Sequence, residues 1–260
     1  MKRITVLAAG ALVAALLSPA VAEAGGTASV TIVHAATYDY PGAPFTVTLC
    51  VDDVVVDDSL SVGDILGPLD APAGPHVVEI TLGADAGCDA PTISEELTFS
   101  AGDDVTVAAI WTSETEGAAL VVWPNDTTCI EAGSARLTVR HGAWTYEPVD
   151  VVGVVDGAAT TIVRDLGEGE QASVEVPGGT LAEDVEVSEG GIGGDLYFTI
   201  GDLGFDEGME YVVYAVGGAD GSAGFFMDQV ERACSTPTTT APTTTTTRAA
   251  AAETQPRFTG

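Results

Sequence analysis

The chain contains one sequence unit twice, and this internal duplication limits its fold more than any other feature. Val30–Ala36 in the first copy matches Leu137–Ala143 in the second, and in each copy a proline follows after four further residues. Further matches pair Val51–Asp53 with Val155–Gly157, Pro72–Gly74 with Pro177–Gly179, Gly102–Val105 with Gly208–Tyr211, and Cys129 with Cys234. Equivalent residues stay 104 to 107 positions apart throughout, a regularity that chance matches would not keep. We therefore expect two tandem domains, at residues 27–129 and 134–234.

Alternating apolar and polar residues predict β-strands within each unit. Phe45–Val51 and Val78–Leu82 place an apolar side chain at every second position, which is typical of a strand with one buried face and one wet face. Asp156-Gly157 predicts a two-residue hairpin turn, because both central residues of such a turn need positive φ. Pro72–Gly74 and Pro177–Gly179 predict further reversals. The expected fold is all-β, with two tandem immunoglobulin-like β-sandwich domains. A small barrel is the alternative.

The repeated unit resembles a bacterial family, the domain of unknown function numbered 4397. The resemblance rests on the motif V-x-I-V-H-A at Val30–Ala35, a proline loop, V-D-D or V-D-G, a P-x-G turn, and G-x-x-V-T-V at Gly102–Val107. The second copy departs from this pattern, because Arg140 stands in place of Val33 and Tyr211–Val213 replaces the V-T-V run. The resemblance implies a sandwich module of exported and cell-surface proteins, and it brings no activity and no catalytic residues with it.

Residues 1–24 have the features of a secretory signal peptide. Met1–Arg3 carries positive charge, and the apolar segment Ile4–Leu17 is short for crossing a bilayer. Small residues follow, so we expect cleavage after Ala24, with Ala22 as the alternative site. Because no later segment has a long uninterrupted apolar run, we expect the mature protein to leave the membrane.

The chain is strongly acidic, with 39 Asp and Glu residues against 8 Lys and Arg residues and a formal net charge of -31. Its one lysine is Lys2, so the expected mature chain has none. Such a field repels phosphate backbones and anionic lipid heads, so we expect neither nucleic acid nor acidic membrane as a partner. Solubility is the simplest reason for the acidity, and adaptation to salt or loose attraction of divalent cations are the alternatives.

Four cysteines, Cys50, Cys88, Cys129 and Cys234, lie in a chain that we expect to be exported, where disulfides persist. Cys50 lies on the strand face opposite the apolar residues, and a bridge to Cys88 would staple a loop with few hydrophobic residues to that strand. Cys129 and Cys234 occupy equivalent ends of the two copies. We therefore predict bridges Cys50–Cys88 and Cys129–Cys234, one of the three pairings that four cysteines allow. The spacings contain no C-x-x-C pair, so we expect no metal site.

Residues 235–260 are rich in threonine and proline and cannot bury a core. We expect a disordered Thr/Pro-rich stalk. Gln255–Gly260 is an incomplete match to a wall-sorting signal, so a plain disordered terminus is the better interpretation. The predicted location is secreted or extracellular, with attachment to the cell wall as an alternative.

Two aromatic segments at equivalent places are the candidate ligand contacts. They comprise Tyr38, Asp39 and Tyr40 in the first copy, and Trp144, Tyr146 and Glu147 in the second. Exposed rings beside carboxylates can stack on sugars while the acids accept hydrogen bonds from hydroxyl groups. The alternative, which we favour, is that these rings cap the open end of each sandwich.

The other polar candidates have structural interpretations. His34 and His141 are in phase with the apolar residues before them, so both should point into the core, and His76 follows Pro75 in a predicted turn. The acidic pairs Asp52-Asp53, Asp57-Asp58 and Asp103-Asp104 do not fit a calcium loop and are typical of turns.

The sequence contains no catalytic motif of a known class. We therefore expect a non-enzymatic exported protein, without cofactor or metal, that has an interaction or envelope-structural role. Its partner would be a glycan or protein of the cell envelope or extracellular space. A receptor for a glycan or another ligand, using residues 37–40 and 144–147, is the first alternative, and a secreted hydrolase is the second.

Overall fold

The structure, a computed structural model, describes residues 25–36, 46–113, 117–143, 148–217 and 223–234. These residues form sixteen β-strands in four four-stranded sheets, which confirms the predicted all-β class. In this described part no helix is long and apolar enough to cross a membrane. The predicted signal peptide, residues 1–24, and the predicted stalk, residues 235–260, lie outside the described residues.

The first half of the molecule contains eight strands between Thr27 and Pro124. They are β1 (Thr27–His34), β2 (Thr46–Val51), β3 (Val54–Ser61), β4 (Ile65–Pro72), β5 (Gly74–Leu82), β6 (Ile93–Phe99), β7 (Asp104–Ser113) and β8 (Gly117–Pro124). One sheet has the order β4-β1-β7-β8, and the other has the order β3-β2-β5-β6. Most neighbours are antiparallel, but β1 and β7 are parallel, with Val30 opposite Val105.

The second half repeats this arrangement strand for strand between Ser134 and Glu231. Its strands are β9 (Ser134–Gly142), β10 (Val149–Val155), β11 (Ala158–Leu166), β12 (Gln171–Pro177), β13 (Leu181–Glu189), β14 (Asp195–Gly204), β15 (Met209–Gly217) and β16 (Ala223–Glu231). The sheet orders are β12-β9-β15-β16 and β11-β10-β13-β14, which are the first-half orders shifted by eight strands. The parallel pair recurs as well, between β9 and β15. The duplication expected from the sequence is therefore present in the topology.

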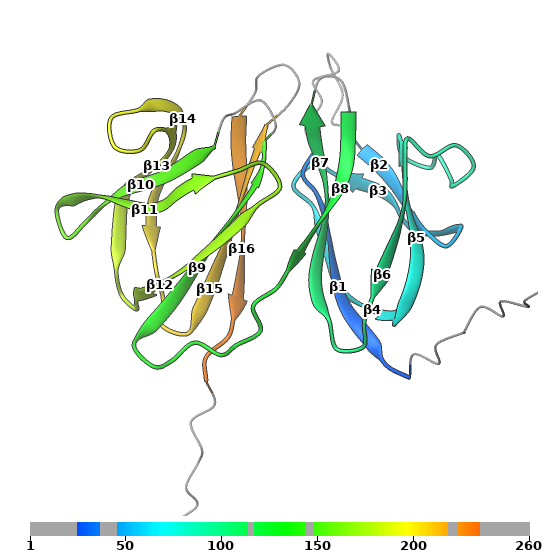
Figure 1. Ribbon diagram of the computed structural model, residues 1–260, viewed down its shortest axis with the longest axis horizontal. Coiled ribbons are helices and arrows are strands. Elements are labelled where there is room, and N and C mark those ends of the chain that lie inside the picture. The colour runs from blue at the N-terminus through cyan, green and yellow to red at the C-terminus, as the bar shows by residue number, and fades with distance from the viewer. Residues whose placement is uncertain (1–24, 37–45, 114–116, 144–147, 218–222, 235–260) are drawn as a thin grey trace, which may run out of the picture.

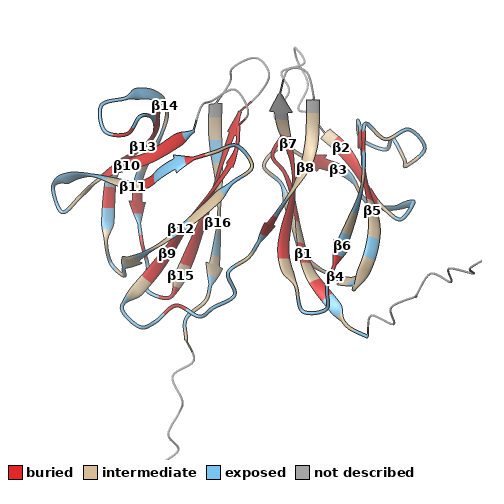
Figure 2. Ribbon diagram, viewed as in Figure 1, coloured by how far each residue is buried: buried red, intermediate tan, exposed pale blue. Residues whose placement is uncertain are grey.

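Each half has a hydrophobic core between its own two sheets (Figures 1 and 2). The side chains that fill the first core alternate along the strands, as Val30 and Ile32 do in β1 and Val47 and Leu49 do in β2. In the second half, Leu137 and Val139 of β9 occupy the equivalent places. The period-two pattern thus identified the core-facing residues of these strands correctly.

The expectation of one wet face is wrong for β2 and β5. Thr48 and Cys50, which point away from the core, are fully buried, and Leu82 is 49% exposed although it was expected to face inward. The physical reason is that the segment from residue 83 to 92 covers this outer face. The Thr48 hydroxyl donates to the Gly83 carbonyl at 3.0 Å, and the Cys50–Cys88 bridge fixes the segment further along.

The turns follow the sequence expectation closely. Asp156 and Gly157 both have positive φ, 52° and 75°, and the equivalent Asp52 and Asp53 have φ of 51° and 64°. These are the two-residue hairpins that join β10 to β11 and β2 to β3. The reversals predicted from Pro72–Gly74 and Pro177–Gly179 also form, between β4 and β5 and between β12 and β13.

Both disulfides have the predicted pairing. Cys50 is bonded to Cys88 within the first half, with a Cα–Cα distance of 5.9 Å. Cys129, in the segment that links the halves, is bonded to Cys234 just beyond β16, with a Cα–Cα distance of 4.8 Å. The second bridge therefore closes a loop that contains all eight strands of the second half.

A third apolar cluster joins the two halves, and we call this contact the seam. It lies between sheet β4-β1-β7-β8 and sheet β12-β9-β15-β16, which face each other in the middle of Figure 1. Its buried members are Val33, Ala35, Ala108, Ile110 and Trp123 from the first half and Val212, Tyr214 and Val216 from the second. Gly142 permits the close approach, because a Cβ there would lie 3.0 Å from Ile110 Cγ2. The central strands β7, β9 and β15 are thus buried on both faces over most of their length.

Candidate functional site

The six candidate ligand contacts cannot be placed individually. Tyr38, Asp39, Tyr40, Trp144, Tyr146 and Glu147 all lie outside the described residues. The strand ends that precede them are described, namely Ala36 after β1 and Ala143 after β9. Both ends lie beside β7. The Ala35 amide donates to the Ala109 carbonyl at 2.9 Å, and Trp111 forms a parallel bridge with Ala143 across the seam. The two candidate segments therefore start from neighbouring positions at one end of the molecule.

Two buried histidines lie at this same end. His34 is 1% exposed and His141 is fully buried, so the prediction that both imidazoles face the core is confirmed. The main chain at each histidine pairs with a loop: His34 accepts from the Gly63 amide at 2.8 Å, and His141 accepts from the Gly169 amide at 2.7 Å. Burial lowers the pKa of His141, and the backbone of Gly167 and the charge of Glu170 oppose this only in part. His141 is therefore neutral near neutral pH.

Arg140 occupies the middle of the seam and is 3% exposed. Its guanidinium donates to the hydroxyl of Tyr214 at 2.8 Å and to the hydroxyl of Thr106, in the first half, at 2.9 Å. It also donates to the side-chain carbonyls of Asn125 and Gln171, and it lies 5.4 Å from the ring centroids of Trp123 and Tyr214. One buried cation thus makes contacts to both halves, through hydroxyls, amides and aromatic faces.

Two further hydrogen bonds cross the seam beside Arg140. The indole Nε1 of Trp123 donates to the Gly169 carbonyl at 2.7 Å, and the side-chain Nε2 of Gln171 donates to the Pro124 carbonyl at 2.7 Å. Gly169 is also the residue whose amide donates to His141. The end of β8 in the first half is therefore connected through one loop to the buried histidine of the second half.

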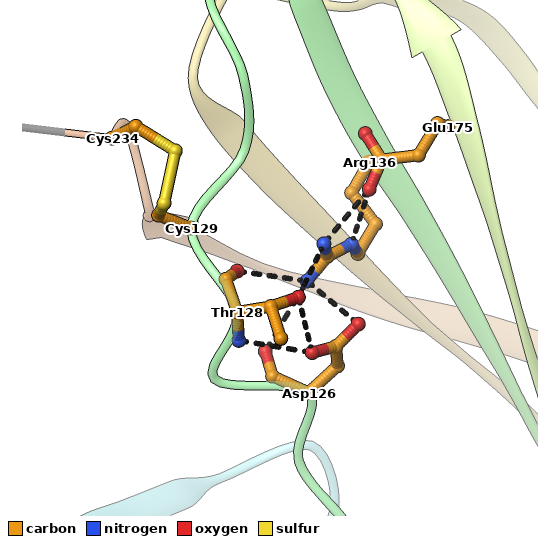
Figure 3. Close-up of a disulfide and its surroundings, with 6 residues drawn as sticks. All are labelled: Asp126, Thr128, Cys129, Arg136, Glu175 and Cys234. Carbon is orange, nitrogen blue, oxygen red and sulfur yellow. Dashed lines mark hydrogen bonds and ion pairs between the residues drawn. A yellow bond between two sulfur atoms is a disulfide. The ribbon is translucent and has the colours of Figure 1, made fainter.

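A polar cluster holds the linking segment on the second half, below the seam (Figure 3). Arg136, which is 5% exposed, lies 3.1 Å from an Asp126 carboxylate oxygen and 2.8 Å from a Glu175 carboxylate oxygen. The side chain and backbone amide of Thr128 donate to Asp126 and lower the pKa of that carboxyl, and Arg136 adds to the effect. The Cys129–Cys234 bridge follows directly, so ion pairs and a covalent bond fix the same segment.

One ionic site in the first half was not predicted. His76 was expected in a turn, but it lies in β5, where its Nδ1 is 2.7 Å from an Asp52 carboxylate oxygen and its Nε2 is 2.7 Å from the Pro72 carbonyl. Both ring nitrogens face acceptors, an arrangement that favours the imidazolium, in which both nitrogens donate. The Asp52 hydrogen bond raises the pKa of His76, and His76 in turn lowers the pKa of Asp52. The Val77 amide donates to the other Asp52 oxygen at 2.9 Å.

The same corner of the second half is an open acidic depression. Its volume is about 590 Å³, and it is lined by Asp156, Gly157, the reversal Pro177–Leu181 and Glu183. The strand register places Thr180 where the first half has His76, because Val155 pairs with Ala182 as Val51 pairs with Val78. The second half therefore has the acidic turn residue without the histidine that pairs with it in the first half.

The acidic pairs have the local contacts expected of turn residues. Asp57 accepts from the Ser59 amide at 2.9 Å, and Asp103 accepts from the Ser100 amide at 2.7 Å. Within the described ranges, no group of three or more His, Cys, Asp or Glu residues is arranged to hold a metal ion.

Comparison with known proteins identifies one domain. Residues 28–152 match the family model of the domain of unknown function DUF4397, so the chain contains one DUF4397 domain over these residues. The matched range includes all eight strands of the first half and extends into β10 of the second. The family model does not detect a second copy. No curated protein matches the chain.

Proposed function

We propose that this chain is an exported, non-enzymatic protein of the cell surface or extracellular space, with an interaction or envelope-structural role. The observation that carries the proposal is the seam, where Arg140, Trp123 and Gln171 join the two halves into one body. A buried interface of this kind fixes the position and orientation of the two halves, and therefore of any binding surface on each half. This property suits a structural or recognition role.

Two disulfides support export, because such bonds form and persist in oxidising compartments. The predicted signal peptide at residues 1–24 and the predicted stalk at residues 235–260 belong to the same proposal. The shared strand order further supports the view that the second half is a diverged copy of the DUF4397 unit. We assign both halves to the immunoglobulin-like sandwiches on the basis of their two packed, mostly antiparallel sheets.

Fractionation of cells that produce the protein tests this proposal. We expect the chain in the envelope fraction or the medium, starting at residue 25, with all four cysteines oxidised on non-reducing gels. A full-length, reduced chain in the cytoplasm would contradict the proposal. Turnover of a polysaccharide or peptide by the purified protein would favour the secreted hydrolase instead.

A second candidate function is a receptor for a glycan or another ligand. It is favoured by one observation, that the strand ends next to Ala36 and at Ala143 both lie beside β7. Residues 37–40 and 144–147 would then act together as one contact surface. A glycan array tests this candidate: binding that is lost in the double variant Tyr38→Ala with Trp144→Ala supports the receptor, and no binding across the array removes it.

A further inference from the structure

The hairpin between β2 and β3 presents an unusual exposed edge. Residues 52–58 read Asp-Asp-Val-Val-Val-Asp-Asp, so three valines lie between two acidic pairs. Val54, Val55 and Val56 are 63%, 46% and 39% exposed. We call Val54–Asp58 of β3 the valine edge.

The valine edge belongs to a strand at the edge of its sheet. In the order β3-β2-β5-β6, β3 pairs with β2 alone. In an antiparallel pair, every second residue points its N–H and C=O away from the partner strand. An exposed apolar edge of this kind is a template for the addition of another strand, and the flanking aspartates and the register shift at Val56 restrict which segments can add to it.

The second half shows that the valines are not needed for the fold. The register places Val54 and Val55 opposite Val51 and Cys50, where β11 has Ala158 and Ala159. Val56 lies at a register shift between Val55 and Asp57, and Thr160 follows Ala159 in β11. The turn differs as well, because Gly157 stands in the place of Asp53. The same hairpin therefore forms from small and polar residues.

The valine edge is also held in place from both ends. At the turn, Asp52 is tied to β5 by His76 and by the Val77 amide. At the other end, the Asp58 carbonyl accepts from the Asp85 amide at 2.9 Å in the segment that the Cys50–Cys88 bridge fixes. A rigid edge loses little conformational entropy on binding, which favours affinity.

Charge determines which partner fits. If two copies paired antiparallel about Val55, Asp53 would lie opposite Asp57 and Asp52 opposite Asp58, and like charges in these positions are destabilising. The first half, residues 27–129, contains no lysine or arginine to offset this repulsion. A partner strand with lysine or arginine beside apolar residues would instead find opposite charges at both ends of the edge.

We propose that the valine edge binds an extended segment of a partner protein that carries lysine or arginine, by addition of a strand to β3. This inference rests on the proposed interaction role and specifies its partner, but it uses a surface distinct from residues 37–40 and 144–147. The valines supply apolar contact, the main chain supplies hydrogen bonds, and the flanking aspartates select for positive charge.

The probe is a synthetic peptide, Lys-Thr-Val-Lys-Val-Thr-Lys, titrated into the oxidised mature protein. We expect saturable binding that weakens as salt is added. A peptide with glutamate in place of lysine should not bind. A peptide with alternate backbone amides N-methylated keeps its charge but cannot add to an edge, so it should bind at least about tenfold more weakly.

The matched variant replaces the three valines by the residues of β11, as Val54→Ala, Val55→Ala and Val56→Thr. It should keep the melting temperature and bind the peptide about tenfold more weakly. The control variant places valine at Ala158, Ala159 and Thr160 of β11. Because β11 lacks the flanking acidic pairs, this variant should gain little affinity for the peptide at that site. If the valine variant unfolds, the pair Asp53→Asn and Asp57→Asn tests the charge requirement on an intact strand.

Three results would overturn the proposal. They are equal binding of the N-methylated peptide, unchanged binding by the valine variant, and no saturable binding of the lysine peptide. If the protein dimerises and the valine variant is monomeric, the occupant is a second copy and the assigned partner is wrong. The proposed function is judged separately, because an exported chain that ignores the peptide disproves only the valine edge.

Discussion

The two halves of the molecule share one strand order and differ in charge. The first half has no lysine or arginine between residues 27 and 129, whereas the second half has Arg136 and Arg140 on β9 and Arg232 just after β16. At equivalent positions of β1 and β9, Val33 and Arg140 both lie in the seam. The comparison shows that the duplicated unit kept its core pattern, while the outer face of one copy changed to bind the other.

The disulfides also differ between the two halves, in what they connect. Cys50–Cys88 staples a surface segment to a single strand, with a separation of 38 residues. Cys129–Cys234 spans 105 residues and encloses the whole second half. One bridge therefore supports local structure, and the other supports the junction between the halves.

The largest expected effect comes from removing the longer bridge. In the chain-entropy model, the double variant Cys129→Ala with Cys234→Ala loses about 4.7 kcal/mol of unfolding free energy, and Cys50→Ala with Cys88→Ala loses about 3.9 kcal/mol. Urea unfolding of both variants measures the difference. A greater loss from the Cys50–Cys88 pair would contradict this ranking of the two bridges.

The seam is tested by Arg140→Val, which gives the second half the residue of the first. We expect a loss of about 3 kcal/mol, because the Tyr214 and Thr106 hydroxyls would lose their buried partner. Arg164 in β11 is exposed and serves as the control. Arg164→Val should change stability by less than about 0.5 kcal/mol in the same thermal unfolding experiment. Equal effects of the two variants would show that Arg140 does not hold the halves together.

The ionic corner of the first half is tested by His76→Thr, which copies Thr180. The pKa of His76 is raised above its ordinary 6.5, so its stabilisation is complete below that value and is lost as pH rises through the raised pKa. Protonation of Asp52 removes the same contact only when the pH falls below 3.8, because the pKa of Asp52 is lowered from that ordinary value. The variant should therefore lose about 1 kcal/mol near pH ~5.5 and less at high pH. Urea unfolding across this range measures the effect, and a pH-independent difference would contradict the assignment.

The smallest expected effect lies in the hairpin turns. Asp53 has a φ of 64°, where its equivalent Gly157 has a φ of 75°. Because glycine adopts positive φ without steric cost, Asp53→Gly should stabilise the protein by about 0.5 kcal/mol, and Gly157→Asp should destabilise it by a similar amount. Paired melting curves test the exchange, and a destabilising Asp53→Gly would mean that the aspartate makes contacts beyond the turn.

The sequence predicted the features that depend on local or periodic patterns. Duplication predicted the repeated topology, the period-two pattern predicted the burial of His34 and His141, and the Asp156-Gly157 dipeptide predicted a turn with positive φ. The equivalent ends of the copies also indicated the Cys129–Cys234 bridge. Each of these signals involves neighbours in the chain or in the repeat, so a single sequence contains it.

The features that the sequence did not predict depend on contacts between distant segments. Coverage of β2 by residues 83–92 buries Thr48, although alternation alone places this residue in water. His76 and Asp52 lie 24 residues apart, and no local or periodic pattern in the sequence connects them. For the seam, the sequence contains one signal. Arg140 of the second half replaces Val33 of the first, and both residues lie on outer sheet faces that the seam buries.

Nitrogen relaxation of the oxidised protein in solution tests most directly whether the two halves form one body. If the seam holds, amides of the first and second halves report the same overall tumbling time, and Arg140→Val separates the two values. Two different and shorter tumbling times in the unaltered protein would show that the halves move independently, and the account of a rigid pair would then be wrong.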